Sequence, residues 1–435
     1  TLHGAPPDVF VPQLEELGAT VVGTNCSVGP AGMLETIERM ARVAQVPLSA
    51  QPNAGRPREI EGRNIYLSSP EYMASYARRF VSNGVRLVGG CCGTTPEHVR
   101  YIKTAVRALA ATAARPSAAR SKDNPRVAVA PVAEPVTRGE KSRLANALAR
   151  GVFTVTVELM PPRGHQVDML VERARQLRIH GVDFVNIPDG PRASARMSAL
   201  AASLVVQQQA GLETILHYAC RDRNLLGMQS DLLGAHSLGV RNVLIITGDP
   251  PRVGDYPDAT AVFDVDSIGL TNVVARLNRG HDIGEQSIGQ PTAFHIGVAV
   301  NPDAPDIDHE VRRFHYKVEA GAEFAITQPV FSAAELAAFL ARIEDKRIPI
   351  LAGLMPLESL RHAEFMANEV PGVRVPDAVV DRIRRAEESG KAVGEGLAIA
   401  REIASEIRPL VQGIQISTSA GAVEAALEVI EAVMT

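Results

Sequence analysis

A short glycine-led junction, repeated along the chain, constrains the fold of this sequence more than any other feature. In each copy a glycine follows an amphipathic stretch and opens a short segment rich in β-formers; these glycines are Gly18, Gly84, Gly181, Gly239 and Gly321. Glycine tolerates the left-handed backbone that commonly ends a helix, so each junction indicates a helix end followed by a strand. Repeated junctions of this kind predict βα units with parallel strands, and therefore an α/β fold.

The expected strands fall into two groups, separated by a segment of different composition. Only three strands precede that segment, at residues 20–23, 47–50 and 86–89, and three βα units are too few to close a barrel. Residues 113–145 are rich in Ala, Pro and Arg and show no useful helical or strand periodicity. We interpret them as an interdomain linker, semi-extended where proline recurs, which places the first domain at residues 1–112.

Residues 146–435 carry a longer series of strands and amphipathic segments. The expected strands lie at residues 154–159, 184–187, 214–218, 242–247, 293–300, 324–327, 349–354 and 413–417. Eight such units in about 290 residues match the size and rhythm of a (β/α)8 TIM barrel, with extra helical material at residues 376–408. An open doubly wound sheet is the alternative. No strand is followed by the GxGxxG fingerprint of dinucleotide-binding folds, and no GxxxxGKS/T phosphate loop occurs.

The composition narrows the functional classes. A chain of 435 residues is too long for one ordinary core, and a net charge of −4 with a pI of about 6.3 favours neither nucleic acid nor an anionic membrane surface as partner. No apolar run is long enough to span a membrane. Four cysteines are too few for a disulfide scaffold and indicate a reducing cytoplasm. The chain starts at Thr1 without an initiator Met or a signal-peptide pattern, so we expect a piece of a longer cytoplasmic protein.

Three of the cysteines follow apolar, strand-like runs. Cys26 ends one run, and Cys91 and Cys92 stand side by side at the end of another. Adjacent cysteines do not readily bridge each other, and α/β proteins keep their chemistry at the carboxyl ends of strands. Three thiolates suit a soft metal such as zinc and leave one tetrahedral position open for a substrate. The alternative is three small buried core residues, because free cysteine is often buried.

Two carboxylates lie at the ends of strands that we expect within residues 146–435. Side chains alternate along a strand, which turns Val157 toward the helices and Glu158 into the mouth of a barrel. A partly desolvated carboxyl there has a raised pKa and is prepared to donate a proton; the alternative is a glutamate paired with a Lys or Arg across the barrel. Asp249, after Gly248 at the end of the fourth strand, is either a ligand contact or an ordinary turn residue before proline.

Three further polar residues are weaker candidates for a functional role. A single histidine on a strand, here His217, is more often a satisfied core residue than a catalyst. Gln328, at the end of the sixth strand, offers a donor and an acceptor at once, which suits the edge of an amide-like heterocycle or a strand cap. Lys317 lies one turn before Gly321, where a lysine is ordinarily a solvated helix residue.

Motifs from both groups resemble known families. The sequences VELMPP at 157–162, TGDPP at 247–251 and AGAEFAITQ at 320–328 resemble the methylenetetrahydrofolate reductase family, over about residues 146–435. The sequences GTNC at 23–26, QPNAG at 51–55 and GGCCGTTP at 89–96 are similar to the homocysteine S-methyltransferase family. Both together, in this order, resemble the bacterial bifunctional fusion of the two enzymes.

The first resemblance implies a barrel that holds FAD without a Rossmann motif and reduces 5,10-methylenetetrahydrofolate to 5-methyltetrahydrofolate. Glu158 falls at the position of the general acid that protonates the folate nitrogen. Asp249 falls at the aspartate that contacts folate and tunes the flavin, and Gln328 at the folate-binding glutamine. The positions expected near FAD are His217, Thr247, Gly248, Asp249, Asn301 and Lys317.

The chain departs from stand-alone bacterial reductases at three places in the flavin region. Residues 188–190 read PDG where those enzymes have Thr-Tyr-Gly; Thr247 replaces an arginine, and Asn301 a tyrosine. The sequence does not say whether NADH, NADPH or another electron donor reduces the flavin. It also encodes no oligomeric state that we can identify.

The second resemblance implies a zinc site made by Cys26, Cys91 and Cys92, with homocysteine as the fourth ligand and methionine as the product. Asn53 is expected to help position the amino acid. The segment corresponds to the last three βα units of an incomplete second barrel, so we expect little or no methyltransferase activity from the chain as given. The competing hypothesis for the whole chain is a barrel protein that binds zinc or folate without catalysis.

Overall fold

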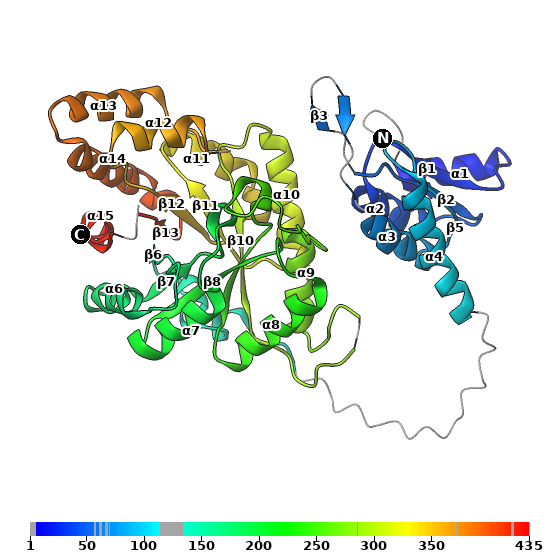
Figure 1. The fold of residues 1–435 in the computed structure, drawn as a ribbon, viewed down its shortest axis with the longest axis horizontal. Coiled ribbons are helices and arrows are strands. Elements are labelled where there is room, and N and C mark those ends of the chain that lie inside the picture. The colour runs from blue at the N-terminus through cyan, green and yellow to red at the C-terminus, as the bar shows by residue number, and fades with distance from the viewer. Residues whose placement is uncertain are drawn as a thin grey trace. The chain divides into compact units, whose positions relative to one another are not determined.

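The structure, a computed structural model, describes residues 6–55, 58–60, 63–65, 68, 70–113, 134–284, 286–370, 372–418 and 422–434. The chain divides into two compact units, Thr1–Val127 and Ala128–Thr435, which we describe one at a time (Figure 1). Among the described helices, none combines the length and the apolar composition that a bilayer crossing requires.

A parallel sheet forms the centre of the described part of the first unit. Its strands β1 (Val22–Asn25), β2 (Leu48–Gln51) and β5 (Val85–Val88) pair in the order β1-β2-β5. They confirm the three expected strands to within two residues. Helices accompany the sheet: α1 (Pro7–Glu16), α2 (Pro30–Ala41), α3 (Pro70–Ser82) and α4 (Pro96–Ala113). The apolar side of α2, with Met33, Ile37 and Met40, is fully buried against the sheet.

A short antiparallel pair in this unit was not expected. It consists of β3 (Arg58–Ile60) and β4 (Arg63–Ile65). The sequence there, REI followed by RNI, lacks the alternating apolar pattern that predicts a half-buried strand.

The second unit contains a closed barrel of eight parallel strands within its described residues (Figure 1). In chain order the strands are β6 (Thr154–Glu158), β7 (Phe184–Ile187), β8 (Glu213–Ala219), β9 (Asn242–Ile246), β10 (His295–Val300), β11 (Phe324–Pro329), β12 (Ile350–Leu354) and β13 (Gly413–Ile416). Each strand pairs with its neighbours in sequence, and β13 pairs with β6 to close the ring. The prediction of a (β/α)8 barrel is confirmed, and the open doubly wound sheet is excluded.

Helices surround the barrel on its outside (Figure 1). They are α6 (Asp168–Ile179), α7 (Ala199–Ala210), α8 (Leu225–Ser237), α9 (Ser267–Leu277), α10 (Ile307–Ala320), α11 (Ala333–Arg342), α12 (Leu360–Asn368), α13 (Asp377–Glu388), α14 (Ala392–Ile407) and α15 (Val423–Met434). α13 and α14 form the extra helical material expected at residues 376–408. The five junction glycines have φ between +80° and +119°, the left-handed conformation that ends a helix.

The end of the expected linker is structured, which corrects our interpretation of residues 113–145. Residues 114–133 lie outside the described part of the chain. Beyond them, η1 (Arg138–Glu140) leads into the short helix α5 (Arg143–Ala149), which Ser142 caps by accepting a hydrogen bond from the Ala145 amide. Leu144 and Leu148 of α5 are buried among inward-facing residues of the barrel strands. This helix therefore belongs to the barrel unit.

Candidate active site and metal centre

A cavity of about 490 Å³ lies at the carboxyl ends of the barrel strands. Its wall contains every residue that the sequence placed in the second site: Glu158, His217, Thr247, Gly248, Asp249, Asn301, Lys317 and Gln328. The parallel barrel brings most of them together because they lie in, at the end of or just beyond β6, β8, β9, β10 and β11 at the same rim, whereas Lys317 reaches the wall from α10 (Ile307–Ala320). The volume is within the range of pockets that bind small molecules and cofactors.

Glu158 is the last residue of β6 and lines this cavity. Its neighbour Val157 is 1% exposed and packs in the outer apolar core, so the alternation expected along the strand is present. Burial raises the pKa of the Glu158 carboxyl to about 7, against the opposing effect of a hydrogen bond from Ser417. A carboxyl with such a pKa holds a proton near neutral pH and can donate it.

The ring of His217 is oriented by a hydrogen bond to Asn186, a residue that the sequence analysis did not identify. The Asn186 amide donates to the Thr156 hydroxyl at 2.6 Å. Its carbonyl oxygen then accepts from His217 Nε2 at 3.2 Å. Burial lowers the pKa of His217 to about 4, so the ring is neutral at physiological pH. The sequence feature that could have indicated this role is a single asparagine on the otherwise apolar strand β7; the structure shows that its side chain is fully buried.

The turn after β9 places Thr247, Gly248 and Asp249 at the cavity. Gly248 has φ of +86°, and a Cβ there would approach the Ala219 side chain to 3.0 Å, so the backbone turns tightly at the wall. The Asp249 carboxylate accepts a hydrogen bond of 2.9 Å from the Arg192 amide. Thr247 Oγ1 accepts one of 3.2 Å from the Ser267 amide, at the start of α9.

Lys317, Asn301 and Gln328 form another part of the wall. Lys317 is only 5% exposed, not solvated as a helix lysine ordinarily is. Its ammonium donates to the Ala299 carbonyl at 2.6 Å and lies 3.8 Å from Glu310. The Asn301 amide donates to the Gly372 carbonyl at 2.7 Å, whereas Gln328 is exposed to the cavity.

A partly buried ion-pair cluster supports the turn after β7 and was also missed. Asp189 accepts hydrogen bonds from the Ala219 amide at 3.0 Å and from Arg223 at 2.8 Å. Arg223 also contacts Asp231, whose carboxylate accepts from the Tyr218 hydroxyl. Asp189 sits in the PDG turn where the sequence departs from stand-alone reductases, so a residue of that departure supports the rim in this chain.

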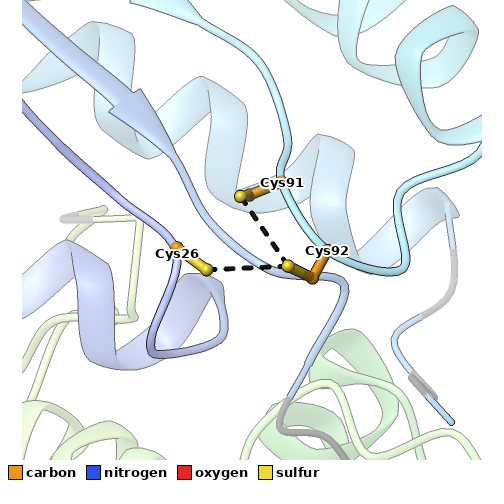
Figure 2. A group of neighbouring side chains, drawn as sticks. All are labelled: Cys26, Cys91 and Cys92. Atoms are coloured by element: carbon orange, nitrogen blue, oxygen red, sulfur yellow. Dashed lines mark hydrogen bonds between the residues drawn. The ribbon is translucent and has the colours of Figure 1, made fainter. Parts of the chain in front are cut away.

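The three cysteines of the first unit converge at the carboxyl ends of β1 and β5 (Figure 2). Their sulfur atoms all lie within 4.8 Å of one another. The Cys26–Cys92 separation is 3.6 Å and the Cys91–Cys92 separation 4.0 Å. Thiolates bound tetrahedrally at about 2.3 Å from zinc are about 3.8 Å apart, so the cluster has the dimensions of a zinc site.

The surroundings of the cluster favour a thiolate. The pKa of the Cys26 thiol is lowered, most strongly by a hydrogen bond from the Ser27 backbone and then by hydrogen bonds from the Cys92 and Cys91 side chains. Asn53 is 3% exposed, and its side-chain oxygen accepts from the Cys92 amide at 3.1 Å. Asn53 thus lies directly beside the cluster, where the sequence placed it.

Comparisons with known proteins identify a similar family for each of the two units. The methylenetetrahydrofolate reductase family matches residues 143–423, and the homocysteine S-methyltransferase family matches residues 1–106. Methionine synthases of Mycobacterium leprae and Mycobacterium tuberculosis are 40% and 42% identical over 106 residues, which cover 24% of this chain and 9% of each relative. Methylenetetrahydrofolate reductase 1 of Schizosaccharomyces pombe is 25% identical over 254 residues, covering 56% of this chain and 39% of that protein.

A solved structure of an uncharacterized protein from Clostridium thermocellum, described as binding two copies of 5-methyl-5,6,7,8-tetrahydrofolic acid, aligns with a TM-score of 0.48 and 14% identity. The alignment covers 68% of this chain and all of that one. The chain spans less than half the length of the curated relatives named above. Because one family match extends over more than half of the sequence, the chain belongs to the methylenetetrahydrofolate reductase family, and its residues 1–106 are similar to the homocysteine S-methyltransferase family.

Proposed function

We propose that the barrel of the second unit reduces 5,10-methylenetetrahydrofolate to 5-methyltetrahydrofolate with FAD as its cofactor. The family supplies the substrate class. The observation that carries the proposal is the half-buried Glu158, whose pKa is raised to about 7, in the wall of a cavity of about 490 Å³. An acid at that place meets the chemical need of the reaction, because the folate nitrogen must accept a proton before its ring can open.

The residues of the cavity fit a flavin ring. Such a ring presents both donors and acceptors at its edge, and the wall offers the neutral imidazole of His217, the Thr247 hydroxyl and the Asn301 amide. The tight turn at Gly248 lets backbone approach a flat ligand closely. Together with Asp249 and Lys317, these residues would hold the cofactor. When bound, the flavin supplies the hydride.

The protein's own residues would handle the proton and the orientation of the folate. Glu158 donates its proton to the folate nitrogen. Gln328, exposed to the cavity, binds the pterin edge through its two-way amide. Asp249, whose carboxylate accepts from the Arg192 amide, would contact the folate and the flavin from the turn after β9. NAD(P)H or another donor would reduce the flavin.

We further propose that the first unit binds zinc through Cys26, Cys91 and Cys92, and that this site holds homocysteine as the acceptor of the methyl group that converts it to methionine. Zinc lowers the pKa of a bound thiol and holds it as a nucleophilic thiolate. Sulfur separations of 3.6 Å and 4.0 Å support this assignment. Asn53, in contact with the backbone of Cys92, is the residue placed to orient the amino acid.

A single-turnover assay tests the reductase. The purified chain is loaded with FAD, reduced without oxygen and mixed with 5,10-methylenetetrahydrofolate. The proposal predicts reoxidation of the flavin, followed by its absorbance near ~450 nm, with one equivalent of 5-methyltetrahydrofolate formed. Folate binding without reoxidation or product would instead support a protein that only binds folate. For the first unit, metal analysis should find zinc in the cysteine site, and a metal-free chain with all three cysteines intact would contradict the zinc assignment.

A further inference from the structure

Two polar residues, Gln415 near the end of β13 and Ser417 just beyond it, lie beside the end of β6, where Glu158 is the last residue. β13 pairs with β6 in parallel, with Gln415 level with Thr156 and Ile416 level with Val157. The next residue, Ser417, is therefore level with Glu158. Gln415 and Ser417 are 6% and 8% exposed, and both line the cavity.

The hydrogen bonds of this pair have a defined direction. The Gln415 amide nitrogen, which can only donate, bonds to Ser417 Oγ at 2.8 Å. The hydroxyl oxygen of Ser417 therefore accepts, which leaves its one hydrogen for the Glu158 carboxyl, and Ser417 lowers the pKa of that carboxyl against the effect of burial. The Ser417 amide is also fixed, because it donates to the Leu354 carbonyl at 2.9 Å.

We propose that Ser417 is a positioning residue for Glu158, and that Gln415 sets the direction of its hydroxyl. The inference rests on the proposed role of Glu158 as proton donor. Because the Ser417 hydroxyl occupies one carboxyl oxygen, the acidic proton of Glu158 resides on the other oxygen. The same hydrogen bond favours the ionised carboxylate and so opposes the effect of burial.

Other titratable groups share the cavity. They are Asp189, His217, Asp249, Glu310, Arg313 and Lys317. The two basic side chains, Arg313 and Lys317, lie near acids: Arg313 is 3.3 Å from Asp266, and Lys317 is 3.8 Å from Glu310. Burial and Ser417 are the two influences identified on the pKa of Glu158.

The direct test is a titration of Glu158 by 13C NMR in the full chain labelled at glutamate carboxyls, with the signal assigned by its loss in Glu158→Gln. Ser417→Ala should raise the midpoint by about one pH unit, as expected for losing a hydrogen bond to a charged group. Ser417→Thr, which keeps the hydroxyl, should restore it. Gln415→Met should shift it in the same direction by less, because the hydroxyl is retained but free to turn.

Thr418→Val is the matched control. It removes a neighbouring hydroxyl that has no hydrogen-bond partner within the described structure, and it should leave the midpoint unchanged. A midpoint in Ser417→Ala that stays within about 0.2 pH units of wild type, or falls, would overturn the proposal.

The folate half-reaction adds a second readout. In Ser417→Ala the alkaline limb of its rate should move to higher pH together with the NMR midpoint, whereas a merely structural role would lower the rate equally at every pH. A wild-type chain that makes no 5-methyltetrahydrofolate but shows the NMR shift would refute the proposed function and leave the positioning role intact. A wild-type chain that turns over, with no shift in Ser417→Ala, would refute the positioning role alone.

Discussion

Leu144→Ala should lower the free energy of unfolding of the barrel by about 3 kcal/mol. Leu144 is fully buried in α5 and packs with inward-facing residues of five strands: Phe184, Ile215, Leu244, Phe324, Ile326 and Leu351. The substitution removes three carbon atoms, worth about 2.4 kcal/mol of transfer free energy. Incomplete collapse around the resulting cavity brings the total to about 3 kcal/mol.

The assay must report on the barrel alone, because the chain has two units and no tryptophan. Pulsed hydrogen exchange along a urea series, read by mass spectrometry on peptides from β7, β9 and β11, does this. Leu226→Ala is the matched control: Leu226 lies on α8 and is 76% exposed, so its loss should cost less than about 0.5 kcal/mol. A cost for Leu144→Ala below about 1 kcal/mol would refute the conclusion that α5 is part of the barrel core.

Three further predictions concern the two sites. The rate of the folate half-reaction should fall about tenfold per pH unit above a midpoint near 7, because only the protonated form of Glu158 can donate; a flat profile from pH 6 to about 9 would be incompatible with this. Glu158→Gln should make the barrel more stable than wild type at pH 8, by about 3 kcal/mol in urea unfolding, because a raised folded-state pKa means that wild type loses stability as pH rises from about 4.5 to about 7. Cys26→Ser should lose most zinc in a chelator competition, whereas Cys220→Ala, in the other unit, should keep it; equal retention would exclude Cys26 as a ligand.

The regular part of the fold could be predicted from the sequence because its signals are local. A glycine that ends a helix, followed by a β-rich segment, marks each junction within a few residues, and all five such glycines have positive φ. The same logic placed Glu158 at a strand end and facing inward. Residues that follow successive parallel strands must meet at one rim, so the cavity wall could be predicted without coordinates.

What could not be predicted depends on contacts distant in sequence. α5 has seven residues, too few to be stable alone, and it forms because Leu144 and Leu148 fit among the barrel strands. Lys317 follows the pattern of a solvated helix lysine, yet its ammonium reaches the Ala299 carbonyl. The partnership of Ser417 with Glu158 is set by the β13–β6 register, which closes the barrel between its first and last strands.

The most direct test of the account is Glu158→Gln examined in the two half-reactions of the proposed reductase. Reduction of the FAD-loaded chain by its electron donor should remain within about twofold of wild type, because no proton from Glu158 is needed there. Reoxidation by 5,10-methylenetetrahydrofolate should slow by about 10²–10⁴-fold, the contribution of a single general acid. Equal losses in both half-reactions, or a folate step as fast as in wild type, would show that Glu158 is not the proton donor.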